Sequence, residues 1–182
     1  KAVEQIEKAI KQYPDEISGL IIEPIQGEGG DNHFRESFFR QLRELANEHE
    51  FLLIYDEVQS GVGITGKMWA HQHYGDDCKP DIISFGKKTQ VCGIFASNRL
   101  NEVEGHVFEE SSRLNSTWGG NLVDMVRFTI YLEIIERENL LDQVKENGAY
   151  LKLGLESLQK KHPETVFNVR NRGLFGAFDL KS

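Results

Sequence analysis

The segment FLLIYDE, residues 51–57, constrains the fold most, because five apolar residues in a row end at two acids. A continuous apolar run bounded by charge is typical of a parallel strand that is buried on both faces. The segment DIISF, residues 81–85, has the same character, and SGLIIEPI, residues 18–25, is a third short apolar run. These three segments predict strands of one parallel sheet.

Helical patterns lie between and around these strands. Residues 35–50 carry apolar side chains at spacings of three and four, which indicates a helix packing one face on a sheet. These side chains are Phe38, Phe39, Leu42 and Leu45. Residues 2–13 predict another helix, which Pro14 stops because proline has no backbone N–H to donate. The order strand, helix, strand, loop, strand indicates an α/β fold.

The second half of the chain changes character. Residues 121–161 predict a long helical stretch that is broken near Glu138 and Asn139, and residues 165–180 switch to strands. We expect residues 1–148 to belong to a large domain and residues 149–182 to begin a smaller α+β domain. Both ends of the sequence interrupt a regular pattern, so we expect the chain to be a fragment of a longer protein.

The charge of the chain limits its partners. It has 29 acidic and 21 basic residues, a net charge of −8, and a pI near 5.3. Nucleic acid or an anionic membrane would repel such a surface. Two cysteines are too few for a disulfide framework, and the sequence shows neither a signal peptide nor an apolar run of about 18 residues. We therefore expect a reduced, cytoplasmic protein.

Ligands bind outside the carboxyl ends of the strands in open parallel sheets. This rule selects EPIQGEGG (residues 23–30), DEVQSG (residues 56–61) and GKKTQ (residues 86–90), together with the glycine-rich loop at residues 60–77. We expect these segments to converge on one site.

Asp56 allows three interpretations. It could be a solvated strand end or helix N-cap. It could hold Mg²⁺ in a nucleotide hydrolase, but that needs a phosphate loop G-x-x-x-x-G-K-[ST], and in the nearest segment, GVGITGKM, Met68 follows Lys67. It could also act with Lys87, because pyridoxal phosphate chemistry needs a lysine amine and a carboxylate against the pyridine nitrogen.

Lys87 and Asp56 follow strands separated by one loop, so their side chains can meet at one edge of the sheet. We expect Lys87 to be buried, since burial favours the neutral amine that acts as a nucleophile. The alternative is a lysine that extends to solvent from a strand end.

Four segments together resemble the class III, or ω-amino acid, aminotransferases of pyridoxal phosphate fold type I. They are LIIEPIQGEGG, LLIYDEVQSGVGITGKMWAHQHYG, PDIISFGKKTQVCG and SSRLNSTWGGNLVDMVR. The resemblance implies a mostly parallel sheet in a cofactor-binding large domain flanked by helices, followed by a small C-terminal domain. Within the family, FGKKTQVCG and SRLNSTWGGN resemble the members that transfer the ε-amino group of L-lysine to 2-oxoglutarate. Members acting on 4-aminobutyrate and ornithine share the general pattern.

The resemblance also implies roles for single residues. Lys87 matches the lysine that forms the Schiff base with the cofactor, and Lys88 has no matching role. Asp56 matches the partner of the pyridinium nitrogen, and Gln59 matches the side chain bonded to the phenolic oxygen. Thr117 matches the threonine that reaches the phosphate of the partner subunit's cofactor, with Asn115 beside it at the substrate. The family therefore implies a homodimer whose active sites lie at the interface.

Glu28 matches a glutamate that helps one site accept two unlike substrates. In similar enzymes it pairs with an arginine while the ω-amine is bound, then releases that arginine to bind the α-carboxylate of the 2-oxo acid. The alternative is a glutamate in a solvent-exposed loop. We expect the phosphate-binding glycines and the arginine to lie outside these 182 residues.

Other polar residues favour structural roles. His71 and His73 form an H-x-H pattern, but no cysteine or carboxylate follows at metal-ligand spacing, so we expect packing and no metal. Arg170 and Arg172 predict surface charges flanking a turn. We expect core positions for four aromatic residues, Phe38, Phe39, Phe128 and Tyr131. Two further hypotheses stay open, namely a non-catalytic folding or interface module and, in a different class, the Mg-nucleotide hydrolase.

Overall fold

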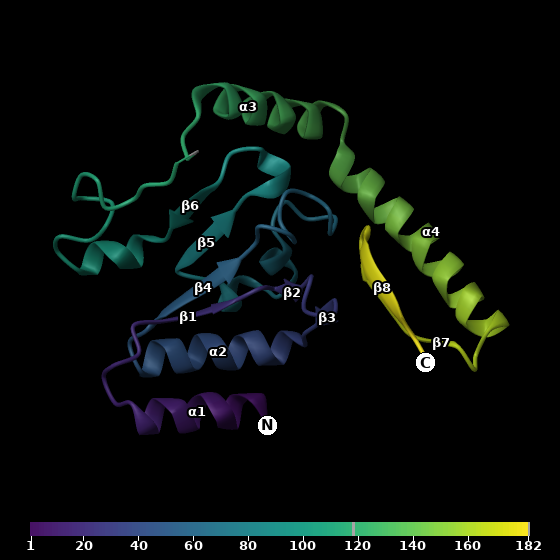
Figure 1. Ribbon diagram of the computed structural model, residues 1–182, viewed down its shortest axis with the longest axis horizontal. Helices are drawn as coiled ribbons and strands as arrows, with labels where there is room; N and C mark the ends of the chain where they lie inside the picture. The colour runs from purple at the N-terminus through teal and green to yellow at the C-terminus, as the bar shows by residue number, and fades with distance from the viewer. Residues whose placement is uncertain (118, 182) are drawn as a thin grey trace.

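The computed structural model describes residues 1–117 and 119–181, and a four-stranded sheet forms its centre (Figure 1). The strand order is β1 (Gly19–Ile22), β4 (Leu52–Asp56), β5 (Ile82–Phe85) and β6 (Gly93–Ala96). β1, β4 and β5 are parallel, whereas β6 runs antiparallel to β5. The predicted α/β fold with a mostly parallel sheet is therefore confirmed.

The predicted strand at residues 18–25 was too long. β1 ends at Ile22, and Ile25–Gln26 form a separate strand, β2, which pairs antiparallel with β3 (Asn32–His33). Pro24 lies at the interruption, and its missing N–H cannot continue a ladder of hydrogen bonds. The chain therefore leaves the main sheet directly before the glycine-rich segment.

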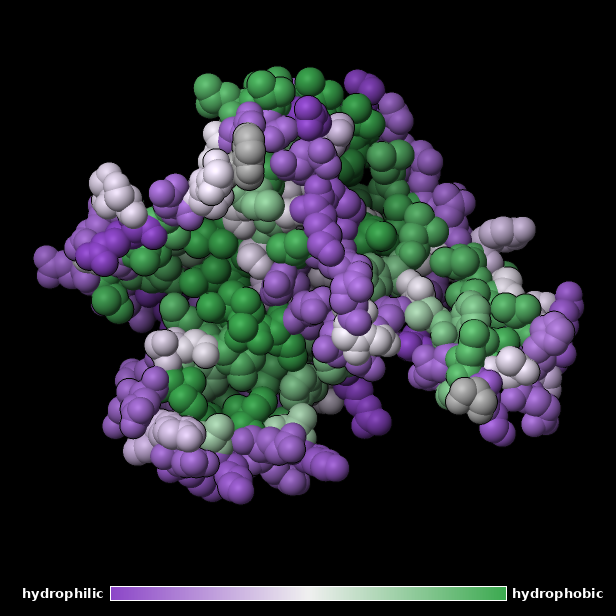
Figure 2. Space-filling model, viewed as in Figure 1, coloured by the Kyte–Doolittle hydropathy of each residue, from purple (hydrophilic) through white to green (hydrophobic). Residues whose placement is uncertain are grey.

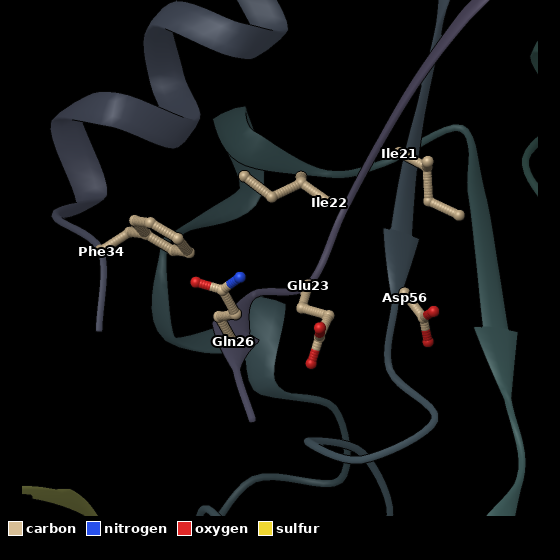
Figure 3. A pocket seen from close by; sticks show the side chains of 6 residues that line it. All are labelled: Ile21, Ile22, Glu23, Gln26, Phe34 and Asp56. Atoms are coloured by element: carbon tan, nitrogen blue, oxygen red, sulfur yellow. The ribbon is translucent and has the colours of Figure 1, made fainter. Parts of the chain in front are cut away.

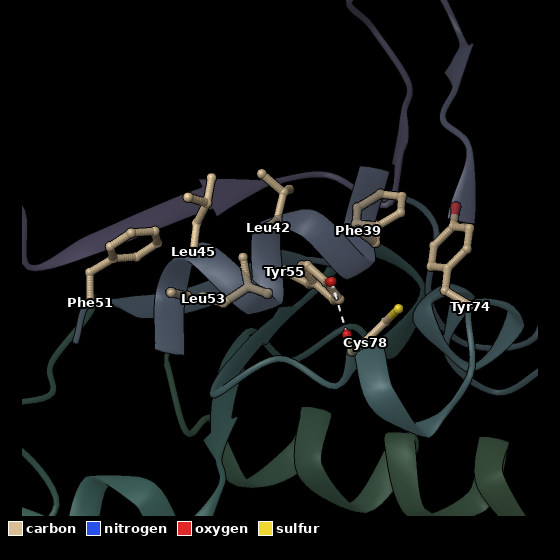
Figure 4. Close-up of a cluster of buried hydrophobic side chains, with 9 residues drawn as sticks. Phe39, Leu42, Leu45, Phe51, Leu53, Tyr55, Tyr74 and Cys78 are labelled. Carbon is tan, nitrogen blue, oxygen red and sulfur yellow. Dashed lines mark hydrogen bonds between the residues drawn. The ribbon is translucent and has the colours of Figure 1, made fainter. Parts of the chain in front are cut away.

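Two helices lie along one side of the sheet: α1 (Ala2–Gln12) and α2 (Glu36–Glu48) (Figure 1). The core forms between α2 and β4, and Figure 4 shows how its side chains meet. Phe39 from α2 stacks on Tyr74 with ring centroids 4.2 Å apart. The fully buried core side chains include Phe39, Leu42, Leu53 and Tyr55. The helical spacing of residues 35–50 was thus correctly interpreted.

β4 is fully covered on only one face. Leu53 and Tyr55 alternate on the buried face, whereas Leu52 and Ile54 on the other face are half-buried. The Tyr55 hydroxyl donates to the carbonyl of Cys78 at 2.9 Å, and burial raises the pKa of Tyr55 well above its usual value. The prediction of burial on both faces is therefore correct for one face.

The helical stretch breaks where the sequence predicted. α3 (Leu122–Arg137) is followed by α4 (Leu140–Lys161), and Asn139 between them has a left-handed backbone with φ of 51°. α4 leads into a hairpin of β7 (Val166–Arg172) and β8 (Phe175–Leu180). A Cβ on Gly148 of α4 would lie 2.6 Å from the backbone of Gly173, so the helix packs directly on the hairpin turn.

α3 exposes much of its apolar surface, which Figure 2 shows as green atoms where Figure 1 places this helix. Its exposed apolar residues include Leu122, Val123, Met125, Val126 and Ile130. Phe128 is only half-buried and Tyr131 is exposed, so the core positions predicted for them were wrong. No helix among the described residues is long and apolar enough to cross a membrane.

Candidate active site

The carboxyl ends of β4 and β5 bring the two central candidates to one edge of the sheet. Asp56 is the last residue of β4 and pairs with Ser84 of β5. Beyond Ser84, β5 ends at Phe85, and Gly86 leads into Lys87. The parallel register therefore places Asp56 and Lys87 at neighbouring strand ends, as the carboxyl-end rule requires.

Lys87 begins the 3₁₀ turn η3 (Lys87–Thr89) and has a left-handed backbone with φ of 51°. A non-glycine residue pays roughly 1–2 kcal/mol for this conformation. Its Nζ donates to Oε1 of Gln59 at 2.9 Å. Lys87 is exposed, so the expectation of a buried amine was wrong, because β5 ends before Lys87 and leaves it in the turn beyond the sheet.

Lys88 is the half-buried member of the pair. Its Nζ donates to the backbone carbonyl of Gln59 at 2.5 Å. Burial lowers the pKa of Lys88, and the neighbouring charge of Lys87 lowers it further. The two lysines therefore hold Gln59 from both sides, one through its side chain and the other through its backbone.

Asp56 is half-buried and lines a hollow of about 400 Å³ together with Glu23, Gln26 and Phe34 (Figure 3). Its Oδ1 accepts from the backbone N–H of Val58 at 3.0 Å. This local bond is the N-cap-like contact that Asp often makes where a strand ends.

Glu28 and Gln59 line a neighbouring groove of about 540 Å³, whose other wall is the β7–β8 hairpin. Glu28 is exposed, and a Cβ on Gly27 would lie 2.8 Å from Cδ of Gln59. Glycine at position 27 therefore allows the loop to approach Gln59 closely. Gln59 therefore contacts Lys87 and also lines the groove of Glu28, whereas Asp56 lines a separate hollow.

Asn115 and Thr117 lie between η4 (Asn98–Glu102) and α3, and both are exposed. Within the part of the chain that the structure describes, no hydrogen bond joins either of them to Lys87, Asp56 or Glu28. Trp118 of the same motif lies outside the described residues. The roles of Asn115 and Thr117 stay predictions.

Glu57 is a structural residue that the sequence analysis did not identify. It is fully buried, and its carboxylate accepts from the backbone N–H groups of Ala70 and His71, each at 2.8 Å, and from Ser60 Oγ at 3.0 Å. Nδ1 of His71 lies 2.9 Å from Oε1 of the same carboxylate. Glu57 therefore closes the glycine-rich loop that begins beside Gln59.

Replacing Glu57 with alanine should lower the free energy of unfolding by about 3–5 kcal/mol, because buried donors would lose their charged acceptor. Urea unfolding of the wild type and variant measures this loss. Glu146→Ala, at an exposed position of α4, is the control and should change stability by less than about 0.5 kcal/mol. Equal effects of the two substitutions would show that Glu57 does not anchor the loop.

The two histidines each contact protein groups. His71 pairs with Glu57, and Nε2 of His73 lies 3.1 Å from both the carbonyl and the hydroxyl of Thr65. Burial lowers the pKa of His73 to about 4, with a further contribution from Arg172. These contacts support the structural interpretation of the H-x-H pattern.

Arg170 and Arg172 do more than flank a turn. Arg170 donates to the backbone carbonyls of Gly30 at 2.9 Å and Asp31 at 2.6 Å. The guanidinium of Arg172 lies 5.5 Å from the centroid of the Tyr74 ring. Their prediction as plain surface charges was wrong, because the folded hairpin packs against the sheet domain.

The whole chain, residues 1–182, matches the family model described as Aminotransferase class-III. The chain belongs to the class III aminotransferases, and its fold is that of the family's pyridoxal phosphate fold type I.

Its similar relatives include an L-lysine-epsilon aminotransferase from Amycolatopsis lactamdurans, 52% identical over 99% of this chain and 40% of the relative. A mitochondrial 4-aminobutyrate aminotransferase from Rattus norvegicus is 39% identical over 98% of this chain and 35% of its own length. The solved lysine aminotransferase from M. tuberculosis in the internal aldimine form matches with a TM-score of 0.95 and 50% identity, over all of this chain and 41% of that one. The chain thus spans about 40% of the length of these two lysine aminotransferases, and it is about 50% identical to each of them.

Proposed function

We propose that the full-length protein is a pyridoxal phosphate-dependent aminotransferase that moves the ε-amino group of L-lysine to 2-oxoglutarate. The products are 2-aminoadipate 6-semialdehyde and glutamate. One observation carries the proposal: the amine of Lys87 contacts Gln59 beside the strand that ends in Asp56. The 52% identity to an L-lysine-epsilon aminotransferase supports the choice of amine.

The residues at the site fit pyridoxal phosphate by their chemistry. An exposed primary amine, Lys87, can reach an aldehyde, and a half-buried carboxylate, Asp56, can bind a protonated ring nitrogen. Oδ1 of Asp56 accepts from Val58, which leaves Oδ2 for the ring. Gln59 supplies a carboxamide already directed at Lys87.

When bound, pyridoxal phosphate supplies an aldehyde that accepts the amino group and a ring that withdraws electrons. The negative charge of Asp56 would favour the protonated form of the ring nitrogen. The carboxamide of Gln59 would hold the phenolic oxygen. Lys87 would move a proton from the ε-carbon of the substrate lysine to the carbon that the cofactor's aldehyde supplies.

The exposure of Glu28 in the groove that Gln59 also lines supports a role in discriminating between the two substrates. The carbon that carries the ε-amine of lysine bears no carboxylate. While this end of lysine occupies the site, the carboxylate of Glu28 can neutralise an arginine that would otherwise have no partner. When 2-oxoglutarate binds, the same arginine is needed for the α-carboxylate, and Glu28 must release it.

The proposal extends to the assembly. We infer a homodimer in which Thr117 and Asn115 act at the partner's site, supported by their exposure and by the exposed apolar side chains of α3.

The unpaired Cys78 and Cys92 suit a cytoplasmic protein. We also propose the domain division near residues 148 and 149, within the continuous helix α4.

A second candidate is the transfer of the amino group of 4-aminobutyrate, favoured by the 39% identity to the rat enzyme. The decisive experiment compares lysine, ornithine and 4-aminobutyrate as donors to 2-oxoglutarate, using the full-length protein. We expect kcat/KM for lysine to exceed that of the others by about 10-fold or more, the lower end of the discrimination that one methylene of substrate length provides. A higher kcat/KM for 4-aminobutyrate or ornithine would reject the lysine assignment.

A further inference from the structure

Arg170 connects the C-terminal hairpin to the loop that carries Glu28. Its Nε donates to the carbonyl of Asp31 at 2.6 Å, and its Nη2 donates to that of Gly30 at 2.9 Å. On the hairpin side, its Nη1 contacts the carbonyl of Asn168 at 2.8 Å and a carboxylate oxygen of Asp179 at 2.9 Å. Arg170 is thus held within the β7–β8 hairpin while it bonds to a loop about 140 residues earlier in the chain.

The loop at residues 27–31 is intrinsically loose. Three of its first four residues are glycine, and glycine loses more conformational freedom on ordering than any other residue. Gly30 has φ of 112° and Asp31 has φ of 49°. The loop's own turn is closed by bonds from the N–H groups of residues 30 and 31 to the carbonyl of Gly27. Bonds from outside the loop therefore determine where Glu28 stands.

Bonds from outside the loop flank Glu28 on both sides. On one side, Oε2 of Glu23 accepts from the N–H of Gly27 at 2.9 Å. On the other side, Nδ2 of Asn32 donates to the carbonyl of Gly29 at 3.1 Å, and Arg170 holds Gly30 and Asp31. Glu28 itself is exposed toward the groove that also contains Gln59 and Arg170. Four of the five N–H donors of Arg170 have partners in these contacts, so its role is to hold the backbone rather than to pair with Glu28.

We propose that Arg170 is a positioning residue that fixes the Glu28 loop and thereby determines how well the site accepts the amine donor relative to the 2-oxo acid. The inference rests on the proposed function, because it assigns to Glu28 the discrimination between two substrates. Glu28 must be in place during the amine half-reaction and must withdraw during the 2-oxo acid half-reaction. Loosening the loop should therefore impair the first half-reaction more than the second.

Arg170→Met, compared with Arg172→Met, provides the test in the full-length protein. Arg172 is on the same strand but stacks on Tyr74, so its substitution removes a similar charge without releasing the loop. In single-turnover measurements, Arg170→Met should lower the second-order rate with lysine by ~10–100-fold, the loss expected for a charged hydrogen bond. The rate with 2-oxoglutarate should change by less than ~3-fold, and Arg172→Met should affect both half-reactions alike.

The dependence on Glu28 can be measured with a double variant. If Arg170 acts through Glu28, then adding Arg170→Met to Glu28→Gln should cause little further loss with lysine, so the two effects should not add. Additive losses, or equal losses in both half-reactions, would overturn the proposal.

Amide hydrogen exchange decides the positioning role independently of activity. Peptides covering residues 27–31 should exchange at least ~10-fold faster in Arg170→Met than in wild type or Arg172→Met, because the loop loses the two bonds that hold its C-terminal half to the hairpin. Unchanged exchange would overturn the positioning role. A wild-type protein that transfers no amino group from any donor would instead reject the proposed function, and the exchange result would still decide whether Arg170 holds the loop.

Discussion

Lys87→Ala should abolish covalent attachment of pyridoxal phosphate and lower transamination by about 10⁴-fold or more, because one amine serves as both the attachment point and the proton carrier. Borohydride reduction followed by peptide mapping of the full-length protein should locate the cofactor on Lys87 in wild type. Lys87 is exposed, and within the described part of the chain its side chain makes one hydrogen bond, to Gln59, so alanine should leave the fold intact.

Lys88→Ala is the matched control, since it removes the adjacent lysine. Lys88 bonds to the backbone of Gln59, so its loss should reduce activity by no more than about 10-fold and preserve the attached cofactor. Attachment to Lys88, or an active Lys87→Ala variant, would contradict the assignment of Lys87.

Asp56→Ala should have the second largest effect, a loss in kcat of about 10²–10³-fold, as when a preorganised electrostatic contact is removed from an active site. The carboxylate keeps the ring nitrogen protonated, and a neutral ring withdraws electrons poorly. Asp56→Asn keeps the shape but loses the charge, so it should be nearly as impaired as alanine.

Gln59→Ala is the comparison for Asp56→Ala, because both residues lie at the carboxyl end of β4 and differ in charge. Loss of the carboxamide should lower kcat by about 10-fold, the effect of one neutral hydrogen bond. Similar losses for Asp56→Ala and Gln59→Ala would count against a special role for negative charge at position 56.

The architecture around β4 was predictable because its cause is local. The apolar runs at β4 and β5 and the helical spacing of α2 reflect which side chains must leave water, and the structure has a strand or helix at each of these places. The antiparallel strand β6 was not predicted, since four residues beginning with glycine give a weak pattern. The end of β1 was not predicted, because the apolar pattern continues through Pro24 although proline cannot continue the ladder of hydrogen bonds.

The site was predictable only in part. The carboxyl-end rule placed Gln59 and Lys87 at neighbouring strand ends, and their side chains do meet. The exposure of Lys87 depends on where β5 ends, and the contact of Arg170 with Gly30 depends on how the hairpin packs. Contacts between residues so distant in sequence leave no local pattern.

The central claim is that Asp56 and Lys87 hold opposite ends of one cofactor ring. A crystal structure of the full-length protein with pyridoxal phosphate tests it most directly. We predict a bond between Nζ of Lys87 and the former aldehyde carbon, and a carboxylate oxygen of Asp56 about 2.7–3.0 Å from the ring nitrogen. A ring bound with its nitrogen turned away from Asp56, or attached to another amine, would contradict the claim.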